Sequence, residues 1–467
     1  MIAFKKWAQK AVEWSETYFE TLREYPVRPP VRPGEIASLL PPSPPEKGEA
    51  MEAIFSDFEK IIVPGITHWQ HPRFFAYFPA NSSPPSVIAE YLTAALAAQC
   101  MLWQTSPAAT ELETVTMDWL RQALDLPEEF GGVIQDSASS ATLCAILTMR
   151  ERALEWKGNS EGLSGNARMR IYCSGHAHSS IDKAVRIAGV GETNLVKVPV
   201  KGERFSIDGA ALKAAIESDI QDGFIPAGIV ALTGATSVGA CDDINAVCDI
   251  AEEFGLYVHV DAAWAGAAMI CPELRALFAG AGRADSITFN PHKWLGVNFD
   301  CNAHFVRSPE DLVRTLAIQP DYLKTHGHDN IINYSEWSVP LGRRFRALKL
   351  WFVLRAYGLE NLREMIRNHI AWSEELAADI VATEIFELTS APMFSLFSFR
   401  FAPQGAKDLD ALNEKLLNAI NDDGRIYLTQ TNHNGNYVIR FQTGQFNTTR
   451  EDVRFAWDVI QDMSKRL

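Results

Sequence analysis

The sequence predicts an α/β protein with a large, mostly parallel sheet domain, a helical N-terminal arm and a small α+β domain at the C-terminal end. Helical and strand-like segments alternate from about residue 85 to 345, a pattern typical of a parallel sheet covered by helices. Before them a proline-rich stretch separates two helical patterns, and after residue 360 helices alternate with short groups of strands. We therefore expect an arm over residues 1–84, a large domain over 85–348 and a small domain over 349–467.

The arm contains two helical patterns joined by a proline-rich strap. Apolar residues recur at helical spacing over residues 4–24 and again over 50–63. Residues 26–45 carry eight prolines, which argue against a helix or a central strand. We expect an extended, ordered strap there, with Ile36, Leu39 and Leu40 as buried anchors. A helix, a strap and a second helix predict an arm that packs on a larger body such as a second subunit.

The large and small domains are predicted from their alternating segments. Helices are expected over residues 86–100, 109–125, 138–156, 179–188, 209–220, 243–254 and 343–357. Strands of the large domain are expected over residues 133–134, 170–173, 195–198, 228–232, 256–260, 286–289 and 303–306. Strands of the small domain are expected over residues 393–401, 425–429 and 437–441.

Charge and cysteine content limit the partners and the compartment. The net charge of −15 disfavours nucleic acid and anionic membranes, which both reward clusters of Lys and Arg. No uncharged apolar run reaches ~18 residues, so a membrane span is not expected. The seven cysteines are odd in number and lack CxxC spacing, which favours free thiols in a reducing cytosol. Together with an N-terminus that shows no signal peptide, these features predict a cytoplasmic protein.

Asp261 and Lys293 are the most informative pair of residues. Asp261 follows the strand-like segment 256–260, and Lys293 lies just past the segment 286–289. This arrangement suits pyridoxal 5'-phosphate, because a lysine amine forms a Schiff base with its aldehyde and a carboxylate pairs with its protonated ring nitrogen. A cofactor bound by both residues narrows the reaction to carbanion chemistry at the α-carbon of an amine or amino acid.

Each of these two residues also has a simpler interpretation. Asp261 could cap a helix that begins at Ala262. Lys293 could be a surface lysine, but its apolar neighbours predict a buried site: Trp294, Leu295, Val297 and Phe299.

A phosphate site is predicted near residue 138. The segment 131–142 is typical of a strand, a tight turn and a helix start, with small hydroxyl residues at the helix N-terminus. Free backbone N–H groups and the helix dipole at such a position hold a phosphate well. An ordinary helix cap is the alternative, and the presence of Asp261 and Lys293 in the same domain favours the phosphate site.

Two further strand ends offer polar side chains. His178 follows the strand-like segment 170–173, where it could stack on the cofactor ring and face the substrate carboxylate. His176 and His178 could instead bind a metal, but no third or fourth ligand lies nearby, so no metal is expected. Thr236 follows the strand 228–232 and could reach the cofactor or fix His178, with a simple turn as the alternative.

The polar segment 320–337 is a candidate lid. It ends in Tyr334-Ser335-Glu336-Trp337, and Tyr334 could donate a proton to a carbanion. A tyrosine that anchors the end of the loop is the alternative.

Taken together, these residues resemble the group II pyridoxal-phosphate amino acid decarboxylases, in particular the aromatic-L-amino-acid decarboxylases. The likeness runs over most of the chain, and jointly its motifs are highly specific. They are HPRFFAYFP (71–79), SPAATELE (106–113), AHSS (177–180), HVDAA (259–263), NPHKW (290–294), VNFDC (297–301) and PLGRRFR (340–346).

The resemblance implies the type I aminotransferase-like fold and an intertwined homodimer with active sites at the interface. It implies that Lys293 carries the cofactor and that Asp261 pairs with the ring nitrogen, with Ala263 beside the ring and His178 stacked on it. It also places four residues around the phosphate, namely Ala138, Ser139, Asn290 and His292. It places Thr236 close to the ring.

The resemblance also implies that Tyr334 lies on a mobile loop and supplies the proton after CO2 leaves. Related aldehyde synthases carry phenylalanine at that position, so simple decarboxylation is expected here. Three positions near the side-chain pocket depart from the animal enzymes. This chain has Ala80 where they have threonine, Met101 where they have phenylalanine and Trp264 where they have tyrosine.

The expected substrate is a small aromatic amino acid. Its side chain would sit among Trp69, Tyr77, Phe78 and Pro79, which could stack against it. Arg73 is the one cation in that stretch, which favours an aromatic substrate over glutamate. The expected reaction converts tryptophan, tyrosine, DOPA or phenylalanine to the arylethylamine and CO2. Alternatives are a glutamate-type decarboxylase, a transaminase or an aromatic aldehyde synthase on the same scaffold, while a non-catalytic binding protein is disfavoured.

Overall fold

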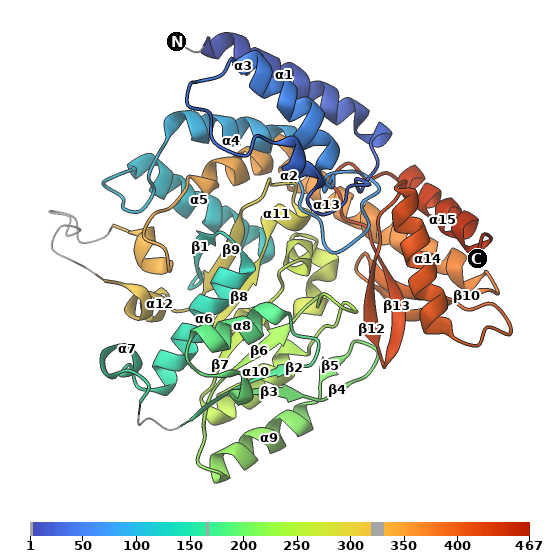
Figure 1. The fold of residues 1–467 in the computed structure, drawn as a ribbon. Coiled ribbons are helices and arrows are strands. Elements are labelled where there is room, and N and C mark those ends of the chain that lie inside the picture. Colours follow the sequence, from blue (N-terminus) through green and yellow to red (C-terminus); the bar gives the residue numbers. More distant parts are fainter. Residues whose placement is uncertain (1–2, 165–167, 319–330) are drawn as a thin grey trace. The chain divides into compact units, whose positions relative to one another are not determined.

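A computed structural model describes residues 3–164, 168–318 and 331–467 (Figure 1). Contacts divide the chain into two compact units. The large unit comprises Ala80–Ala371 and Pro392–Leu396, and the small unit comprises Met1–Pro79, Trp372–Ala391 and Phe397–Leu467. The arm residues therefore group with the C-terminal residues, because the segment around Phe75 is hydrogen-bonded to the small sheet. The predicted three-part division stays a prediction.

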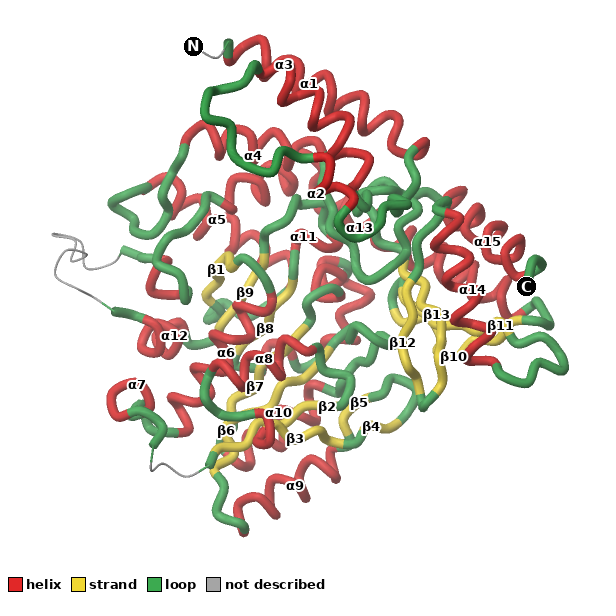
Figure 2. Tube along the Cα trace, viewed as in Figure 1, coloured by secondary structure: helices red, strands yellow, loops and turns green. Residues whose placement is uncertain are grey.

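The large unit is built on one seven-stranded sheet in the order β1-β9-β8-β7-β6-β2-β3 (Figure 2, yellow). Its strands are β1 (Gly131–Gln135), β2 (Met169–Ser174), β3 (Leu195–Val198), β6 (Ile225–Leu232), β7 (Tyr257–Asp261), β8 (Ser286–Phe289) and β9 (Asn302–Val306). Strand β9 runs antiparallel to both of its neighbours, and the pairs from β8 to β3 are parallel. A two-stranded ribbon, β4 (Val200–Lys201) with β5 (Ser206–Ile207), was not predicted.

Within the described residues, nine α-helices lie wholly in the large unit. They are α4 (Pro84–Leu96), α5 (Pro107–Leu124), α6 (Ala138–Ala153), α7 (Gly158–Glu161), α8 (Ser179–Ile187), α9 (Gly209–Gln221), α10 (Ile244–Phe254), α11 (Pro291–Trp294) and α12 (Pro309–Leu316). Of these, α5, α6, α9 and α10 contact the sheet directly. Every residue of β7, β8 and β9 is buried, as expected for strands covered on both faces. The predicted alternation of helices and strands is confirmed, with boundaries that differ by a few residues.

The small unit has its own four-stranded sheet, in the order β10-β11-β13-β12. Its elements are α1 (Phe4–Thr21), α2 (Glu35–Leu39), α3 (Met51–Asp57), β10 (Phe386–Met393), β11 (Leu396–Phe401), α14 (Leu409–Asp423), β12 (Thr429–His433), β13 (Asn436–Gln442) and α15 (Arg450–Ser464). Helix α13 (Arg346–Val381) begins in the large unit and ends in the small one, with a kink at Gly358. The rings of Phe75 and Phe441 stack in the core of the small unit, 4.4 Å apart.

Several expectations for the arm and the small unit were wrong. Leu39 and Leu40 are exposed rather than buried, and the strap contains the short helix α2 in its proline-free stretch. The strand expected over residues 393–401 is two strands separated by a turn at Phe394, whose φ is positive. Residues 425–428 precede β12 and form only an isolated bridge, from Tyr427 to Phe74.

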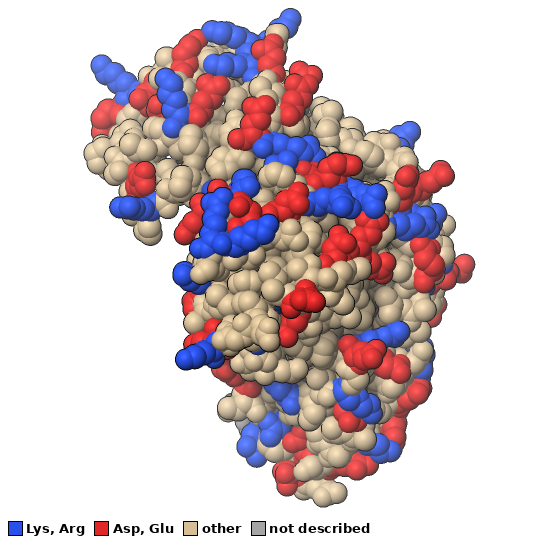
Figure 3. Space-filling model, turned by 90° about the vertical axis from the view of Figure 1, so that its right-hand side faces the viewer, with Lys and Arg blue, Asp and Glu red and all other residues tan. Residues whose placement is uncertain are grey.

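Surface charge and hydropathy agree with the composition. On the face in Figure 3, Lys and Arg are interspersed with Asp and Glu, and no broad basic area is visible. Within the described ranges, no helix combines the length and the apolar character needed to cross a bilayer. All seven cysteines are free and buried, as predicted.

Candidate active site

The carboxyl ends of β6, β7 and β8 bring the predicted cofactor residues to one edge of the large sheet. Strand pairing sets Leu232 beside Asp261, and Asp261 beside Thr288. The turns beyond these strands are hydrogen-bonded to one another: Thr233 N–H donates to Asp261 O at 3.0 Å, and Asn290 N–H donates to Ala263 O at 2.9 Å. This edge is the ligand-binding edge of open α/β sheets.

Gly234 shows how tightly these turns pack. Its φ of 74° lies in the left-handed region that glycine tolerates best. A Cβ at this position would collide with Ala265, so the turn after β6 lies directly on the segment after Asp261.

Asp261, Lys293 and His178 lie within electrostatic range of one another. Desolvation by the surrounding protein lowers the pKa of His178, Asp261 opposes that shift, and Lys293 reinforces it. Asp261 is 8% exposed, and its Oδ1 accepts from the Ala263 N–H at 3.0 Å. His178 caps α8, and its Nδ1 accepts from the Ser180 N–H at 3.1 Å. Three side chains from separate turns of the sheet edge are thus close enough to influence one another electrostatically, and their roles stay a prediction.

The predicted phosphate residues also come together. The N–H of Ala138, at the start of α6, donates to Asn290 Oδ1 at 3.1 Å, and Asn302 Nδ2 donates to the same oxygen at 2.8 Å. Ser139 is exposed in the first turn of α6, and its hydroxyl has no hydrogen-bond partner among the described residues. The helix start therefore offers free donors to an anion.

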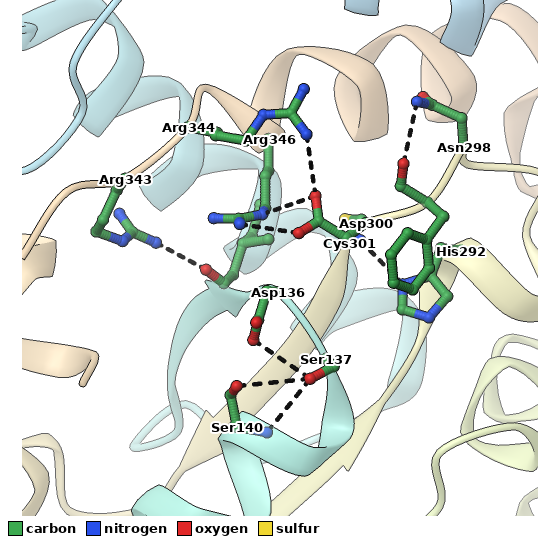
Figure 4. A network of polar contacts seen from close by, with 12 residues as sticks. Asp136, Ser137, Ser140, His292, Asn298, Asp300, Cys301, Arg343, Arg344 and Arg346 are labelled. Carbon is green, nitrogen blue, oxygen red and sulfur yellow. Dashed lines mark hydrogen bonds and ion pairs between the residues drawn. The ribbon is translucent and has the colours of Figure 1, made fainter. Parts of the chain in front are cut away.

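His292 is held as a neutral ring in one tautomer. Its Nδ1 accepts from the Cys301 N–H at 2.9 Å, so the proton of the neutral ring is on Nε2 (Figure 4). Burial lowers the pKa of His292 to about 3, with Lys293 as the next cause. Nε2 has no hydrogen-bond partner within the described part of the chain, so it can donate to an acceptor from outside the protein.

Lys293 itself is half-buried, and its apolar neighbours differ in burial. Trp294, Leu295 and Val297 are fully buried, which agrees with the predicted buried site. Trp294 stacks on Trp264 at 4.8 Å. Phe299 was expected to be buried but is 63% exposed, and its ring lies edge-on to His292 at 4.8 Å.

The remaining ring-side residues have mixed environments. Thr236 is half-buried in the turn after β6, and Ala263 is half-buried after β7. The Oγ1 of Thr233 is buried without a partner in the described structure, which leaves a polar group available in the same turn. His176 Nδ1 lies 3.2 Å from Ser237 Oγ, so this histidine is engaged with a hydroxyl.

Tyr334 is packed into the large unit. It is 2% exposed, its hydroxyl lies 3.0 Å from Thr114 Oγ1, and the guanidinium carbon of Arg343 lies 4.9 Å from its ring centroid. Burial raises the pKa of Tyr334, with Glu113 as the second cause. These contacts support the anchoring role, and the proton-donor role stays a prediction. Most of the candidate lid, residues 320–330, lies outside the described residues.

The expected substrate-side residues belong to the small unit. Trp69 and Tyr77 are 40% and 45% exposed, and their rings stack at 5.6 Å. Phe78 and Pro79 are buried. Arg73 and Arg23 both pair with Asp452, at 3.0 and 2.7 Å, so the Arg73 guanidinium is already engaged with a carboxylate.

Sequence reasoning missed several polar residues at the sheet edge. Asn81 donates to the backbone oxygens of His292 and Lys293, and Asn302 bridges Thr288 and Asn290. No local pattern marks these asparagines, because their partners are distant in sequence.

The donor set fits pyridoxal phosphate. The second carboxylate oxygen of Asp261 has no partner among the described residues, so it can accept from a protonated ring nitrogen. Ser139, Asn290 and His292 supply neutral donors for a phosphate, and Ala138 begins the helix whose start faces it. Lys293 supplies the amine on the same edge. A parallel-sheet domain with this lysine, this aspartate and a helix N-terminus between them defines a pyridoxal-phosphate enzyme of the type I aminotransferase-like fold.

Comparisons with known proteins agree. The model of the pyridoxal-dependent decarboxylase conserved domain matches residues 33–402. The aromatic-L-amino-acid decarboxylase of Sus scrofa is 41% identical over 99% of this chain and 96% of that protein. Phenylacetaldehyde synthase of Petunia hybrida is 37% identical over 98% of this chain and 94% of that protein. The structure of Catharanthus roseus tryptophan decarboxylase in complex with L-tryptophan is 36% identical, covers 99% of this chain and 98% of that chain, and superposes with a TM-score of 0.94.

The chain therefore belongs to the pyridoxal-dependent decarboxylase family, and its cofactor is pyridoxal 5'-phosphate.

Proposed function

We propose that this protein decarboxylates aromatic L-amino acids to the arylethylamine and CO2. The observation that carries the proposal is that Asp261, Lys293 and His178 lie within electrostatic range of one another at the sheet edge, in a chain of the decarboxylase family. The relatives named above act on aromatic amino acids or make aromatic aldehydes, which supports an aromatic substrate.

Each site residue has a proposed task. When bound, the cofactor supplies an electron sink for the bond that breaks at the α-carbon. Lys293 holds the cofactor covalently and Asp261 keeps a proton on its ring nitrogen. His178 lies against the ring and faces the substrate carboxylate. Ala138, Ser139, Asn290 and His292 hold the phosphate, while Thr236 and Ala263 line the ring.

The substrate side chain is proposed to contact Trp69, Tyr77, Phe78 and Pro79. The exposed ring faces of Trp69 and Tyr77 suit an aromatic group. The Arg73 guanidinium, which a glutamate side chain would need, is already engaged with Asp452. Both observations favour aromatic substrates over glutamate.

A cytoplasmic homodimer is proposed as the working form. Helix α4 exposes Ile88, Leu92 and Leu96, at 55%, 39% and 63%, on one face. An apolar stripe of this kind marks an interaction surface, and a second copy is its proposed partner. The seven free thiols support a reducing compartment. Light scattering of the wild type and of Leu92→Asp tests the dimer: we expect twice the chain mass for the first and a shift toward monomer for the second.

A product assay tests the function. Purified protein is supplied with pyridoxal phosphate and with tryptophan, tyrosine, DOPA, phenylalanine or glutamate, and CO2, amine and aldehyde are measured. We expect equal amounts of CO2 and arylethylamine from at least one aromatic substrate and none from glutamate. CO2 release from glutamate alone would reject the aromatic assignment.

The second candidate is an aromatic aldehyde synthase on the same scaffold. It is favoured by the 37% identity to phenylacetaldehyde synthase. Aldehyde and ammonia as the main products, with little amine, would establish it.

A further inference from the structure

Asp300 lies in a group of charged side chains next to the proposed phosphate residues (Figure 4). Its carboxylate accepts from Arg346 Nη2 at 2.9 Å and from Arg346 Nε at 3.2 Å. Arg344 lies 3.4 Å away, and Lys349 Nζ lies 4.0 Å away. The two-pronged contact with Arg346 fixes both position and orientation of the carboxylate.

Lys349 is buried to an unusual degree for a lysine. It is 1% exposed, and its Nζ lies 3.1 Å from the carboxylate of Glu90 in α4. Burial lowers its pKa to about 8. A buried charge persists only when it is paired, so Glu90 and, at longer range, Asp300 stabilise the Lys349 ammonium.

The loop between Lys293 and β9 is thereby held on two sides. The Asn298 N–H donates to the buried Ser86 Oγ of α4 at 2.7 Å, and Asp300 is bound by α13. The next residue, Cys301, donates its N–H to His292 Nδ1 at 2.9 Å. Asp300 and the cations that bind it touch no reacting atom. They are linked to His292, a proposed phosphate donor, through one backbone amide, the N–H of Cys301.

We infer that Asp300 is a positioning residue for the cofactor phosphate. Arg346 and Lys349 hold the Asp300 carboxylate, which places the Cys301 N–H against Nδ1 of His292. This contact keeps the His292 proton on Nε2, where it donates to the phosphate. The inference rests on the proposed function, because it requires that the chain binds pyridoxal phosphate.

The test compares two ligands that differ only in the phosphate. Pyridoxal phosphate and pyridoxal are titrated into the full-length, cofactor-free protein, and quenching of tryptophan fluorescence gives each dissociation constant. For Asp300→Asn we expect the dissociation constant of pyridoxal phosphate to rise about tenfold or more, while that of pyridoxal is unchanged. A general loss of structure would weaken both ligands together.

A second variant guards against misfolding of Asp300→Asn. Arg346→Lys keeps a cation but loses the two-pronged contact, so we expect a smaller loss confined to pyridoxal phosphate. Asp219→Asn is the matched control, because Asp219 accepts from Arg170 Nε at 3.1 Å and from the Tyr172 hydroxyl at 2.9 Å near the start of β2. This control should lower the melting temperature and leave both affinities as in the wild type.

Two results would overturn the inference. One is wild-type affinity for pyridoxal phosphate in folded Asp300→Asn and Arg346→Lys proteins. The other is an equal loss for both ligands. A wild-type protein that binds neither ligand would instead refute the proposed function, so the two failures are distinguishable.

Discussion

At the scale of single residues, the chemistry depends on how Asp261 is held. Its Oδ1 is fixed by the Ala263 N–H, and the strand pairs on both sides fix its backbone. The carboxylate therefore needs no rearrangement to meet a cationic ring nitrogen, and such preorganisation is where electrostatic catalysis gains most.

Asp261→Asn tests this role. The amide keeps the size of the side chain but cannot stabilise a ring proton by charge. We expect the cofactor still to attach to Lys293, while kcat falls about 100-fold or more. Steady-state kinetics and the visible absorbance of the bound cofactor measure the two effects separately. A variant with wild-type kcat would show that the ring proton is held in another way.

Tyr334→Phe tests the predicted proton donor. If Tyr334 supplies the proton, the variant makes less amine and releases aldehyde and ammonia. Its burial against Thr114 and Arg343 instead predicts a lower melting temperature with an unchanged product ratio. Tyr322, the other tyrosine of the segment 320–337, provides the comparison as Tyr322→Phe, and it lies outside the described residues. An unchanged amine yield from Tyr334→Phe would remove Tyr334 from the mechanism.

The cofactor residues proposed from the sequence share one property: each lies at the end of a buried strand or at a helix start. Asp261, Asn290 and Lys293 could be placed because the carboxyl ends of parallel strands meet at one edge. Asp300 and Asn81 could not, because their roles come from partners distant in sequence. The exposure of Phe299 was missed for a related reason, since local apolarity does not report which residues turn outward.

At the scale of elements, a buried ion pair ties α5 to β1 and to the segment before α13. Glu113 accepts from Arg343 at 2.7 and 3.1 Å, and both side chains are almost fully buried. Glu113 also accepts from the Ile134 N–H at 2.8 Å, and Arg343 donates to Ile134 O at 2.7 Å. Strand β1 directly precedes α6, so this pair supports the helix start that is proposed to bind phosphate.

Loss of one partner should be costly. In Glu113→Ala the Arg343 charge is left buried and unpaired, so we expect the free energy of unfolding to fall by about 3–5 kcal/mol. The double variant Glu113→Leu/Arg343→Met removes both charges and should recover much of that loss. Denaturant titration measures all three proteins. A double variant as unstable as Glu113→Ala would contradict the argument.

Element boundaries were predictable where the chain repeats one local pattern. Strands β7 and β8 are short buried segments rich in β-branched and aromatic residues, and the sequence shows this composition. The turn at Phe394 and the late start of β12 depend on a positive φ and on a bridge from Tyr427 to Phe74. Neither feature can be predicted from the local periodicity of the sequence.

At the scale of the whole molecule, buried histidines shape the response to acid. Burial lowers the pKa of His292, His304 and His369 to about 3 each. Below about pH 6.5 these histidines bind protons in the unfolded chain but stay neutral in the folded chain. Their contribution to the free energy of unfolding is therefore fully present above that pH and is lost progressively as the pH falls toward 3. Burial raises the pKa of Asp242 to about 6, which offsets part of this loss between about pH 6 and 4.

His304→Leu should reduce this acid sensitivity. Both ring nitrogens of His304 are buried without partners in the described structure, so leucine removes a group that must not be protonated. As the pH falls below 6, we expect the variant to lose less free energy of unfolding than the wild type does, by roughly 1.4 kcal/mol for each pH unit. Denaturant titrations between pH 5 and pH 8 measure the slope, and the value at pH 8 isolates the packing effect. An unchanged slope would show that His304 does not contribute.

The central claim is that Lys293 carries the cofactor of an aromatic amino acid decarboxylase. The most direct test measures CO2 and arylethylamine from tryptophan, tyrosine, DOPA and phenylalanine with the wild type and with Lys293→Ala, beside the visible absorbance of each protein. We predict equal amounts of CO2 and amine from the wild type. For Lys293→Ala we predict loss of both turnover and the absorbance of the attached cofactor. Normal turnover by Lys293→Ala, or no CO2 from any aromatic substrate with the wild type, would contradict the claim.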